Sequence, residues 1–322
     1  FVERSVTKPH QPPPPPPDDV AQVAHACCCS IGFIEDILAQ LQRKGQVIFF
    51  GPPGTGKTFV ARKIAEYLAE GDDSRRELIQ FHPSYTYEDF MEGIKPESRQ
   101  CDGDRWEVSY PVRAGSFKRF CERAAEDPEQ TYVFVIDEIN RGQIAKIFGE
   151  LMYLLEYRDD EIELAYTKSE TDDRERFGIP RNVRIIGTMN TADRSIALVD
   201  FALRRRFTFI PFYPDEGNVR QMLPTWLERN APGMRWVGRL LDQFNEQLAE
   251  AMGRDYLIGH SYFMQPGLDE DLINEIWRYQ IEPLLHEYFI GTPERVRDEF
   301  ALNRLIRRAK GEAAPGGEDG EQ

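Results

Sequence analysis

Residues 51–58 read GPPGTGKT and match the pattern G-x-x-x-x-G-K-[ST], between an apolar stretch at 47–50 and a helical pattern. Glycines in such a P-loop let backbone N–H groups turn towards phosphate oxygens, and the following helix start adds partial positive charge. Lys57 is expected to reach the β- and γ-phosphates, and the Thr58 hydroxyl to bind Mg²⁺. The predicted triphosphate site comprises Gly51, Pro52, Pro53, Gly54, Thr55, Gly56, Lys57 and Thr58.

A pair of acids follows a second apolar stretch. Residues 133–136 (VFVI) have the pattern of a buried strand, and Asp137 and Glu138 come directly after it. The carboxyl end of such a strand lies at the sheet edge that also holds the P-loop. We expect Asp137 to hold Mg²⁺ through water, and Glu138 to orient and deprotonate the attacking water. The alternative is a strand end with two exposed acids, which the upstream P-loop disfavours.

Asn190 follows a third apolar strand, at 183–187, and begins the segment NTAD. This segment is similar to the Asn-Lys-x-Asp with which small G proteins read guanine, but Thr191 stands in place of the lysine. If strand 183–187 lies beside the strand before the P-loop, Asn190 emerges over the γ-phosphate, away from the base. We therefore expect Asn190 to position water rather than to read guanine.

Three consecutive arginines, 204–206, lie between a short helical pattern and a strand at 207–210. An arginine from a neighbouring subunit can neutralise charge on a transferred phosphoryl group, because its guanidinium is always charged and forks onto phosphate oxygens. Arg205 and Arg206 are the candidates for this role, with Arg204 behind them. A solvated basic face is the alternative.

The elements that must position these residues alternate between strands and helices. Short apolar strands are expected at 47–50, 78–81, 132–136, 183–187 and 207–210. Helices are expected between them, at 30–43, 57–70, 116–126 and 143–156. This alternation predicts an α/β fold whose parallel sheet is flanked by helices. Further amphipathic helices are expected at 216–230, 234–252, 269–290 and 293–309.

The chain is expected to divide into four parts. Residues 1–29 form a proline-rich linker or remnant, although the folded part begins near Val20. Residues 30–213 form the α/β domain, 214–310 a smaller α-helical domain, and 311–322 a disordered acidic tail. Because the first residue is not Met, we expect this sequence to be a piece of a longer protein.

Composition excludes several classes of protein. The 322 residues are 41% hydrophobic, which supports a packed core, but no apolar run approaches the roughly 18 residues of a membrane span. Without a signal peptide either, a cytoplasmic location is expected. The net charge of −15 restricts any DNA contact to a local surface. The five cysteines form no C-x-x-C pair, so no metal site is expected among them, and 27–29 is expected to be reduced and partly buried.

Several longer segments carry a family resemblance. The most specific is MNTADRS at 189–195, and it is joined by QFHPSYTYEDFMEG at 80–93 and FVIDEINRGQIAKIFGELMYLLE at 134–156. With the P-loop and IGHSYF at 258–263, these segments resemble the McrB family of AAA+ nucleotidases over about residues 33–289.

The resemblance implies an AAA+ P-loop NTPase domain followed by an α-helical lid, assembled into a ring, hexameric in this family. It also implies Mg²⁺-dependent hydrolysis that prefers GTP over ATP and is stimulated by an McrC-like endonuclease subunit. Such a complex translocates DNA and restricts modified sites. No segment of this chain resembles a nuclease, so the chain is expected to hydrolyse nucleotide without cutting DNA itself.

The resemblance also suggests roles for residues around the site. Asn140 and Arg141 are expected to face a neighbouring subunit, and Asp193 and Arg194 to order the signature loop and its partner contacts. The segment 87–90 (YEDF) is either a core-packed turn or a surface facing the pore of the ring.

In the expected lid, His260 or Ser261 is predicted to lie near the base or ribose. A lid-packing turn, with Tyr262 and Phe263 in the core, is the alternative.

Two further functions stay open on the sequence alone. No residue shows guanine selection directly, so an ATP-driven AAA+ defence or remodelling protein is one alternative. A nucleotide-gated assembly scaffold is another, although the intact Glu138 disfavours a permanently inactive protein.

Overall fold

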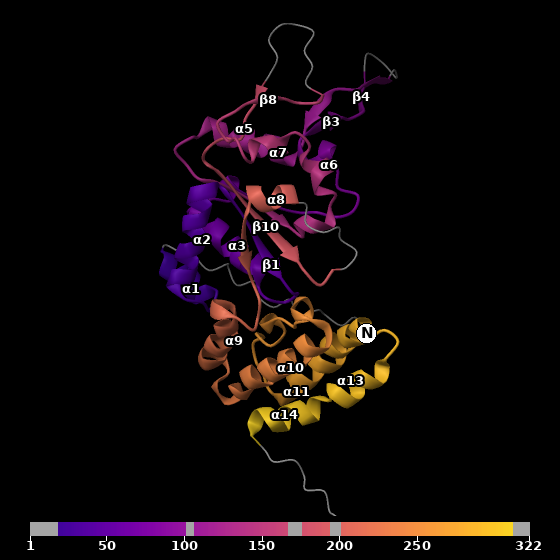
Figure 1. Cartoon of the computed structure of the whole chain (residues 1–322). Helices are drawn as coiled ribbons and strands as arrows, with labels where there is room; N and C mark the ends of the chain where they lie inside the picture. The colour runs from indigo at the N-terminus through magenta and orange to yellow at the C-terminus, as the bar shows by residue number, and fades with distance from the viewer. Residues whose placement is uncertain (1–18, 101–105, 167–175, 194–200, 312–322) are drawn as a thin grey trace, which may run out of the picture.

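The computed structural model describes residues 19–100, 106–166, 176–193 and 201–311; for residues 201 and 202 it describes the backbone only. Its centre is a five-stranded sheet in which all neighbouring strands are parallel (Figure 1). The strands are β1 (Gln46–Gly51), β2 (Arg76–Gln80), β7 (Tyr132–Asp137), β10 (Val183–Asn190) and β11 (Thr208–Pro211). The predicted parallel α/β sheet is confirmed.

The strand order is β11-β1-β10-β7-β2, which places the P-loop strand β1 between β10 and β11. Gly51, the last residue of β1, is paired in register with Asn190, the last residue of β10. On the other side of β10, Asp137 at the end of β7 is paired with Gln80 of β2. The carboxyl ends of β1, β7 and β10 therefore lie together at one edge of the sheet.

Helices cover both faces of this sheet. Val47 and Phe49 of β1 pack against α1 (Val20–Ala26), α2 (Ile31–Lys44) and α3 (Lys57–Leu68). The intervening Ile48 points to the opposite face, as the two-residue period of a strand requires. That face is covered by α4 (Tyr87–Phe90), α5 (Ser116–Glu126), α6 (Ile144–Phe148) and α7 (Leu151–Leu154). The fold is thus a three-layer arrangement.

Helix ends follow from local sequence. The Ser30 side chain accepts a hydrogen bond from the Phe33 N–H and caps α2, as predicted. The single helix predicted at 143–156 is instead divided into α6 and α7, because Gly149 between them adopts a positive φ of 48°. Helix α1 begins at Val20, where the folded part was expected to begin.

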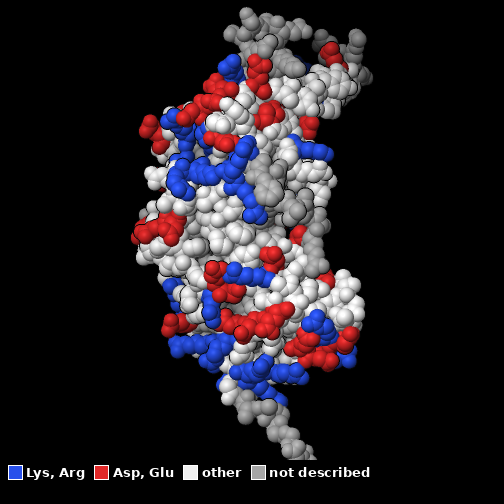
Figure 2. Space-filling model, in the orientation of Figure 1, with Lys and Arg blue, Asp and Glu red and all other residues white. Residues whose placement is uncertain are grey.

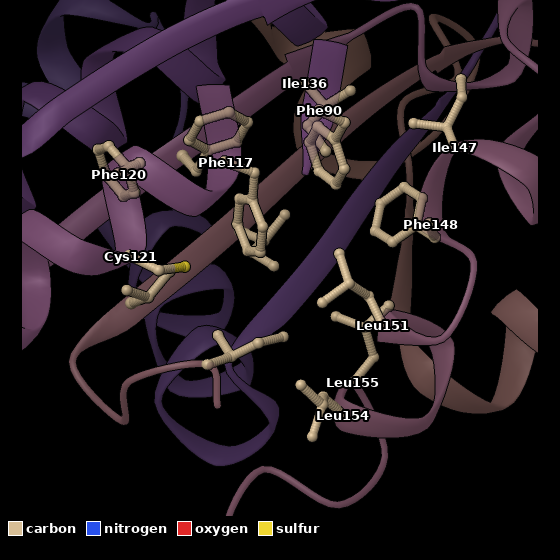
Figure 3. Close-up of a cluster of buried hydrophobic side chains, with 14 of the residues drawn as sticks. Phe90, Phe117, Phe120, Cys121, Ile136, Ile147, Phe148, Leu151, Leu154 and Leu155 are labelled. Carbon is tan, nitrogen blue, oxygen red and sulfur yellow. The ribbon is translucent and has the colours of Figure 1, made fainter. Parts of the chain in front are cut away.

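Phe90 anchors the segment 87–90 in the core. Its ring stacks on Phe117 with 4.9 Å between centroids and lies 5.1 Å from the Phe148 ring. Figure 3 shows these three residues in the buried cluster. Phe90 is fully buried. The core-packed turn is therefore the alternative that the structure supports for this segment.

A long antiparallel hairpin, not predicted from the sequence, extends from the α/β part. Its strands are β3 (Glu92–Ile94), β4 (Glu97–Gln100), β5 (Trp106–Ser109) and β6 (Val112–Ala114). One register runs from the pair Glu92–Ala114 to the pair Gln100–Trp106. A second short hairpin pairs β8 (Ile162–Glu163) with β9 (Arg176–Phe177).

The helical part lies below the sheet in Figure 1 and has its own core. It contains α9 (Gly217–Asn230), α10 (Trp236–Met252), α11 (Glu270–Ile276), α12 (Glu282–Tyr288), α13 (Pro293–Glu299) and α14 (Leu302–Lys310). A π-helical turn, Trp277–Ile281, joins α11 to α12, so the predicted helix 269–290 is one continuous run. The predicted helix 293–309 is divided near Phe300. The predicted domain boundary at 213–214 stays a prediction.

In the described residues, no single helix is long and apolar enough to cross a membrane; α1 and α2 reach that length only as a pair, bent by 115°.

Candidate functional site

The P-loop turns tightly between β1 and α3. Gly56 has a φ of 78° and directly precedes Lys57, the first residue of α3, so a left-handed conformation starts the helix. Gly51 meets the chain after β11, because a Cβ at Gly51 would lie 2.3 Å from the Phe212 carbonyl oxygen. The N-terminus of α3 and the loop before it form the kind of backbone cradle that binds phosphate.

Lys57 is buried within this loop. Its Nζ donates to the carbonyl oxygens of Gly51 at 2.9 Å and Pro52 at 2.6 Å. Burial lowers the pKa of Lys57 to about 8, and the nearby charges of Glu138 and Asp137 oppose this shift. The ammonium group therefore lies between the P-loop and the acid pair, where a triphosphate would need its charge.

Asp137 is held by two threonines. Its Oδ1 accepts hydrogen bonds from Thr58 Oγ1 at 2.6 Å and from Thr188 Oγ1 at 2.5 Å. Mg²⁺ prefers carboxylate, hydroxyl and water oxygens, and the contact between Thr58 and Asp137 brings a hydroxyl and a carboxylate together. The donor set at this point of the sheet edge fits the predicted Mg²⁺ site.

Thr188 was not predicted as a site residue. It lies on β10, two residues before Asn190, and its hydroxyl also accepts the backbone N–H of Glu138 at 3.2 Å. Its side chain thus orients both acids. The signal in the sequence was weak, because a threonine within an apolar strand is a common residue and only the pairing of β10 with β7 brings it to Asp137.

Glu138 adopts a left-handed backbone with φ of 51°, a conformation that is uncommon outside glycine. Its Oε2 is buried without a hydrogen-bond partner and lies 3.4 Å from Arg141 Nε, as an ion pair without hydrogen-bond geometry. Burial raises the pKa of Glu138, and the Arg141 charge partly opposes that rise. A desolvated carboxylate with a raised pKa is a stronger base, which suits proton abstraction from water.

Arg141 connects Glu138 to the signature segment. Its Nη2 lies 3.3 Å from Asp193 Oδ2, and its side chain is 45% exposed. Arg194, the other residue predicted to order this segment, lies outside the described residues.

Asn140 is buried within its own chain. Its Nδ2 donates to the Asn190 carbonyl oxygen at 3.0 Å. The structure therefore does not place Asn140 on a surface that faces a neighbouring subunit, in contrast to the expectation, because the turn after Glu138 packs it against β10.

Asn190 lies beside the start of the P-loop. Because β10 is the direct neighbour of β1, Asn190 is level with Gly51, and the next residue, Thr191, donates its N–H to the Gly51 carbonyl at 3.1 Å. The Asn190 Oδ1 accepts the Ala192 N–H at 3.3 Å. The strand adjacency on which the water-positioning prediction depended is thus present.

The two candidate arginines differ in the exposure of their side chains and in their contacts. The side chain of Arg205 is 63% exposed, and its Nη2 lies 3.0 Å from Glu156. Arg206 is buried; it contacts the same carboxylate at 3.1 Å and donates to the Met152 carbonyl at 2.5 Å. In Figure 2, Lys and Arg side chains gather at the level of α8 (Phe201–Arg206) and α2, consistent with the contact of Lys44 Nζ with the Arg205 carbonyl.

Arg205 is therefore the accessible candidate for contact with a neighbouring subunit, whereas Arg206 stabilises its own chain in this structure.

The lid turn containing His260 and Ser261 contacts the P-loop directly. The Ser261 N–H donates to the Gly54 carbonyl at 2.9 Å, and His260 is buried, with its Nε2 3.5 Å from where a Cβ of Gly56 would stand. Burial, together with the nearby positive charge of Lys57, lowers the pKa of His260 to about 4. The structure thus brings both residues to the phosphate end of the site, and Phe263 is buried in the lid core.

Two family models match the chain. Residues 46–207, half of the chain, match the AAA domain (dynein-related subfamily), and residues 237–297 match the alpha-helical lid domain of McrB. These two matches contain the predicted nucleotide-binding and lid residues.

Two curated relatives are similar over most of the chain. The Type IV methyl-directed restriction enzyme EcoKMcrB subunit of Escherichia coli K12 is 43% identical over 85% of this chain and 60% of its own length. The Type II restriction enzyme BsuMI component YdiS of Bacillus subtilis 168 is 24% identical over 73% of this chain and 74% of its own length. The chain thus spans about 60% of the length of the E. coli relative. With an AAA domain over half of its length and an McrB lid after it, the chain belongs to the McrB family of AAA proteins.

Proposed function

We propose that this chain is the GTP-preferring, nucleotide-hydrolysing motor subunit of a modification-dependent DNA restriction complex. The observation that carries the hydrolytic part is the meeting of Thr58, Asp137 and Thr188 through one carboxylate oxygen, beside Lys57 and Glu138. The restriction context rests on the E. coli relative, a subunit of a methyl-directed restriction enzyme.

The residues divide the chemistry between them. The P-loop N–H groups and Lys57 bind the triphosphate, and Thr58 and Asp137 would hold Mg²⁺, which would neutralise charge on the phosphate oxygens. Glu138 takes the proton of the attacking water, whose position Asn190 fixes. These residues lie at, or just after, the carboxyl ends of β1, β7 and β10, which are consecutive strands in the sheet order.

An arginine that acts on the nucleotide of a neighbouring subunit requires a ring of several copies of this chain. We propose six copies, by resemblance to the family. In that ring Arg205 of one copy reaches the nucleotide of the next, because a guanidinium can stabilise the transferred phosphoryl group. Its exposure makes Arg205 the better candidate than Arg206.

We further propose that an McrC-like endonuclease subunit is the partner, and that this partner stimulates turnover and cuts DNA. This chain drives DNA translocation in the cytoplasm and has no nuclease activity of its own. Addition of such a partner should raise turnover. A chain that binds nucleotide and assembles with the partner, yet stays without turnover, would instead support the scaffold alternative.

The test is steady-state hydrolysis of GTP and ATP, measured side by side with Mg²⁺, with Lys57→Ala as the control and gel filtration of the same samples. Preferential GTP turnover that Lys57→Ala abolishes is the expected result. A clear preference for ATP would contradict GTP selection and favour an ATP-driven AAA+ protein with the same catalytic residues.

A further inference from the structure

A turn of the lid is joined to the outer side of the P-loop by backbone hydrogen bonds. The Gly259 N–H donates to the Pro53 carbonyl at 3.0 Å, and the Ser261 N–H donates to the Gly54 carbonyl at 2.9 Å. We name residues 258–261 the lid clasp. It connects two segments about 200 residues apart in the chain, a contact that local sequence patterns do not reveal.

Glycine is needed where the lid clasp meets the P-loop. A Cβ on Gly259 would lie 1.9 Å from the Gly54 carbonyl carbon and 2.4 Å from the Thr55 nitrogen. The backbone of Gly259 is extended, with φ of −74° and ψ of 160°, which any residue adopts. Close approach to the P-loop, and not backbone conformation, is therefore what a larger side chain would disturb.

The lid holds the clasp in place from its other side. Asn245, a buried residue of α10, donates from Nδ2 to the Ile258 carbonyl at 2.9 Å and accepts the Ile258 N–H on Oδ1 at 2.8 Å. This pair of bonds satisfies both backbone groups of Ile258. A short chain of contacts thus runs from α10 through Asn245 and Ile258 to Pro53 and Gly54.

His260 fills the space between the clasp and the P-loop. It is 2% exposed, and its Nδ1 is buried without a hydrogen-bond partner, which is a costly state for a polar atom. Its ring lies against Gly56, next to Lys57. The ring is therefore enclosed between the clasp and the P-loop, and the two segments are in contact through side-chain packing as well as through backbone hydrogen bonds.

The hydrogen bonds between the lid clasp and the P-loop use different backbone groups from those that bind phosphate. The clasp uses P-loop carbonyl groups, which are acceptors, and so takes up none of the N–H groups that a phosphate needs. The loop is held from outside while its donors stay available to the ligand. A displacement of the lid would therefore change the shape of the phosphate cradle without removing any group that binds phosphate.

We propose that the lid clasp positions the P-loop for the triphosphate, with Gly259 and Asn245 as positioning residues that make nucleotide affinity depend on the placement of the lid. This inference rests on the proposed nucleotide hydrolysis and adds a structural coupling between lid and P-loop that the family matches do not assign.

The experiment compares Gly259→Ala, Asn245→Ala and wild type for binding of a fluorescent GTP analogue and of ATP, and for KM and kcat. Gly259→Ala should raise KM and Kd by about tenfold or more, the scale of one or two lost hydrogen bonds. Asn245→Ala should raise them less, because it loosens the clasp without adding atoms. The rise in Tm on adding nucleotide should shrink in both.

Gly238→Ala is the matched control, because its Cβ would lie 3.8 Å from Pro224 within the lid, an ordinary contact. The Tm and circular dichroism of each nucleotide-free variant show whether it is folded, and Asn245→Ala decides if Gly259→Ala does not fold. Folded variants that bind nucleotide as wild type does, even with a lower Tm, would overturn the clasp as a positioning element. A wild type that binds neither nucleotide would overturn the proposed function, and the inference with it.

Discussion

Thr58 and Thr188 donate hydrogen bonds to the same oxygen, Oδ1 of Asp137, one from the P-loop helix and one from β10. The Asp137 carboxylate is thereby fixed relative to two neighbouring elements of the sheet edge. A side chain held from two directions keeps its position with little loss of entropy when a ligand arrives.

Thr188→Val should lower turnover by about 10- to 100-fold, as expected for the loss of a group that orients a metal-binding carboxylate. The substitution removes the hydroxyl that contacts Asp137 and the Glu138 N–H and keeps the branched shape. Mg²⁺ dependence of GTP and ATP turnover is the measurement. Thr292→Val, which makes the same change in the lid, is the control, and equal activity of the two variants would contradict the role of Thr188.

Glu138→Gln should keep nucleotide binding and lower turnover by about 10²- to 10⁴-fold, because the amide cannot accept the proton of water. Its shape is nearly unchanged, so the P-loop should be undisturbed. Equilibrium binding and single-turnover hydrolysis separate the two steps. Turnover close to that of wild type would exclude Glu138 as the base.

Arg206→Ala should mainly reduce stability, whereas Arg205→Ala should mainly reduce turnover. Arg206→Ala should lower the free energy of unfolding by about 1–3 kcal/mol, because Arg206 is buried and its loss removes a charged donor from the Glu156 carboxylate and the Met152 carbonyl. Arg205→Ala should leave the urea midpoint nearly unchanged and lower turnover of the assembled protein.

Mixing provides the sharper test of Arg205. Arg205→Ala and Glu138→Gln subunits are each inactive in this scheme, but a mixed ring has sites that combine an intact Glu138 with an intact Arg205. Recovery of turnover on mixing is expected, and its absence in rings shown to be mixed would place Arg205 outside the site.

His260 should make stability depend on pH. In the folded chain its pKa is lowered to about 4, against 6.5 for the free side chain. Between these values the unfolded chain binds a proton that the folded chain does not, so stability should fall as the pH decreases from 6.5 towards 4, by at most about 3 kcal/mol. Urea unfolding at several pH values is the measurement, and His260→Gln should remove this part of the slope.

Phe90→Ala should lower the free energy of unfolding by about 3–5 kcal/mol, because it opens a cavity among packed rings. Trp106→Ala, on the hairpin, should change it by about 0.5 kcal/mol or less, because Trp106 is 62% exposed. Similar losses in the two variants would show that the hairpin is packed in solution.

The site residues that could be predicted from the sequence are those that belong to short, local sequence patterns. The P-loop, the acid pair and the buried strands depend on short patterns, and the Ser30 cap depends on one hydroxyl. The hairpin of β3 to β6 was missed because its strands are short, partly charged and carry exposed apolar side chains, so no buried run marks them.

Contacts between distant segments could not be predicted in the same way. Arg205 and Arg206 are neighbours in the chain, and the tertiary structure buries Arg206 against the Met152 carbonyl while Arg205 stays exposed. Likewise, the contact of Ser261 with Gly54 depends on how the lid lies against the P-loop.

The position of β10 has a consequence for synthesis of the chain. This strand is the fourth of the five in sequence order, yet it lies between β1 and β7. Until residue 190 has left the ribosome, the P-loop strand and the acid strand have no common neighbour, and a fragment that ends before residue 183 carries both motifs without the strand that joins them. Such a fragment should not hydrolyse nucleotide, although every residue of the P-loop and both acids are present.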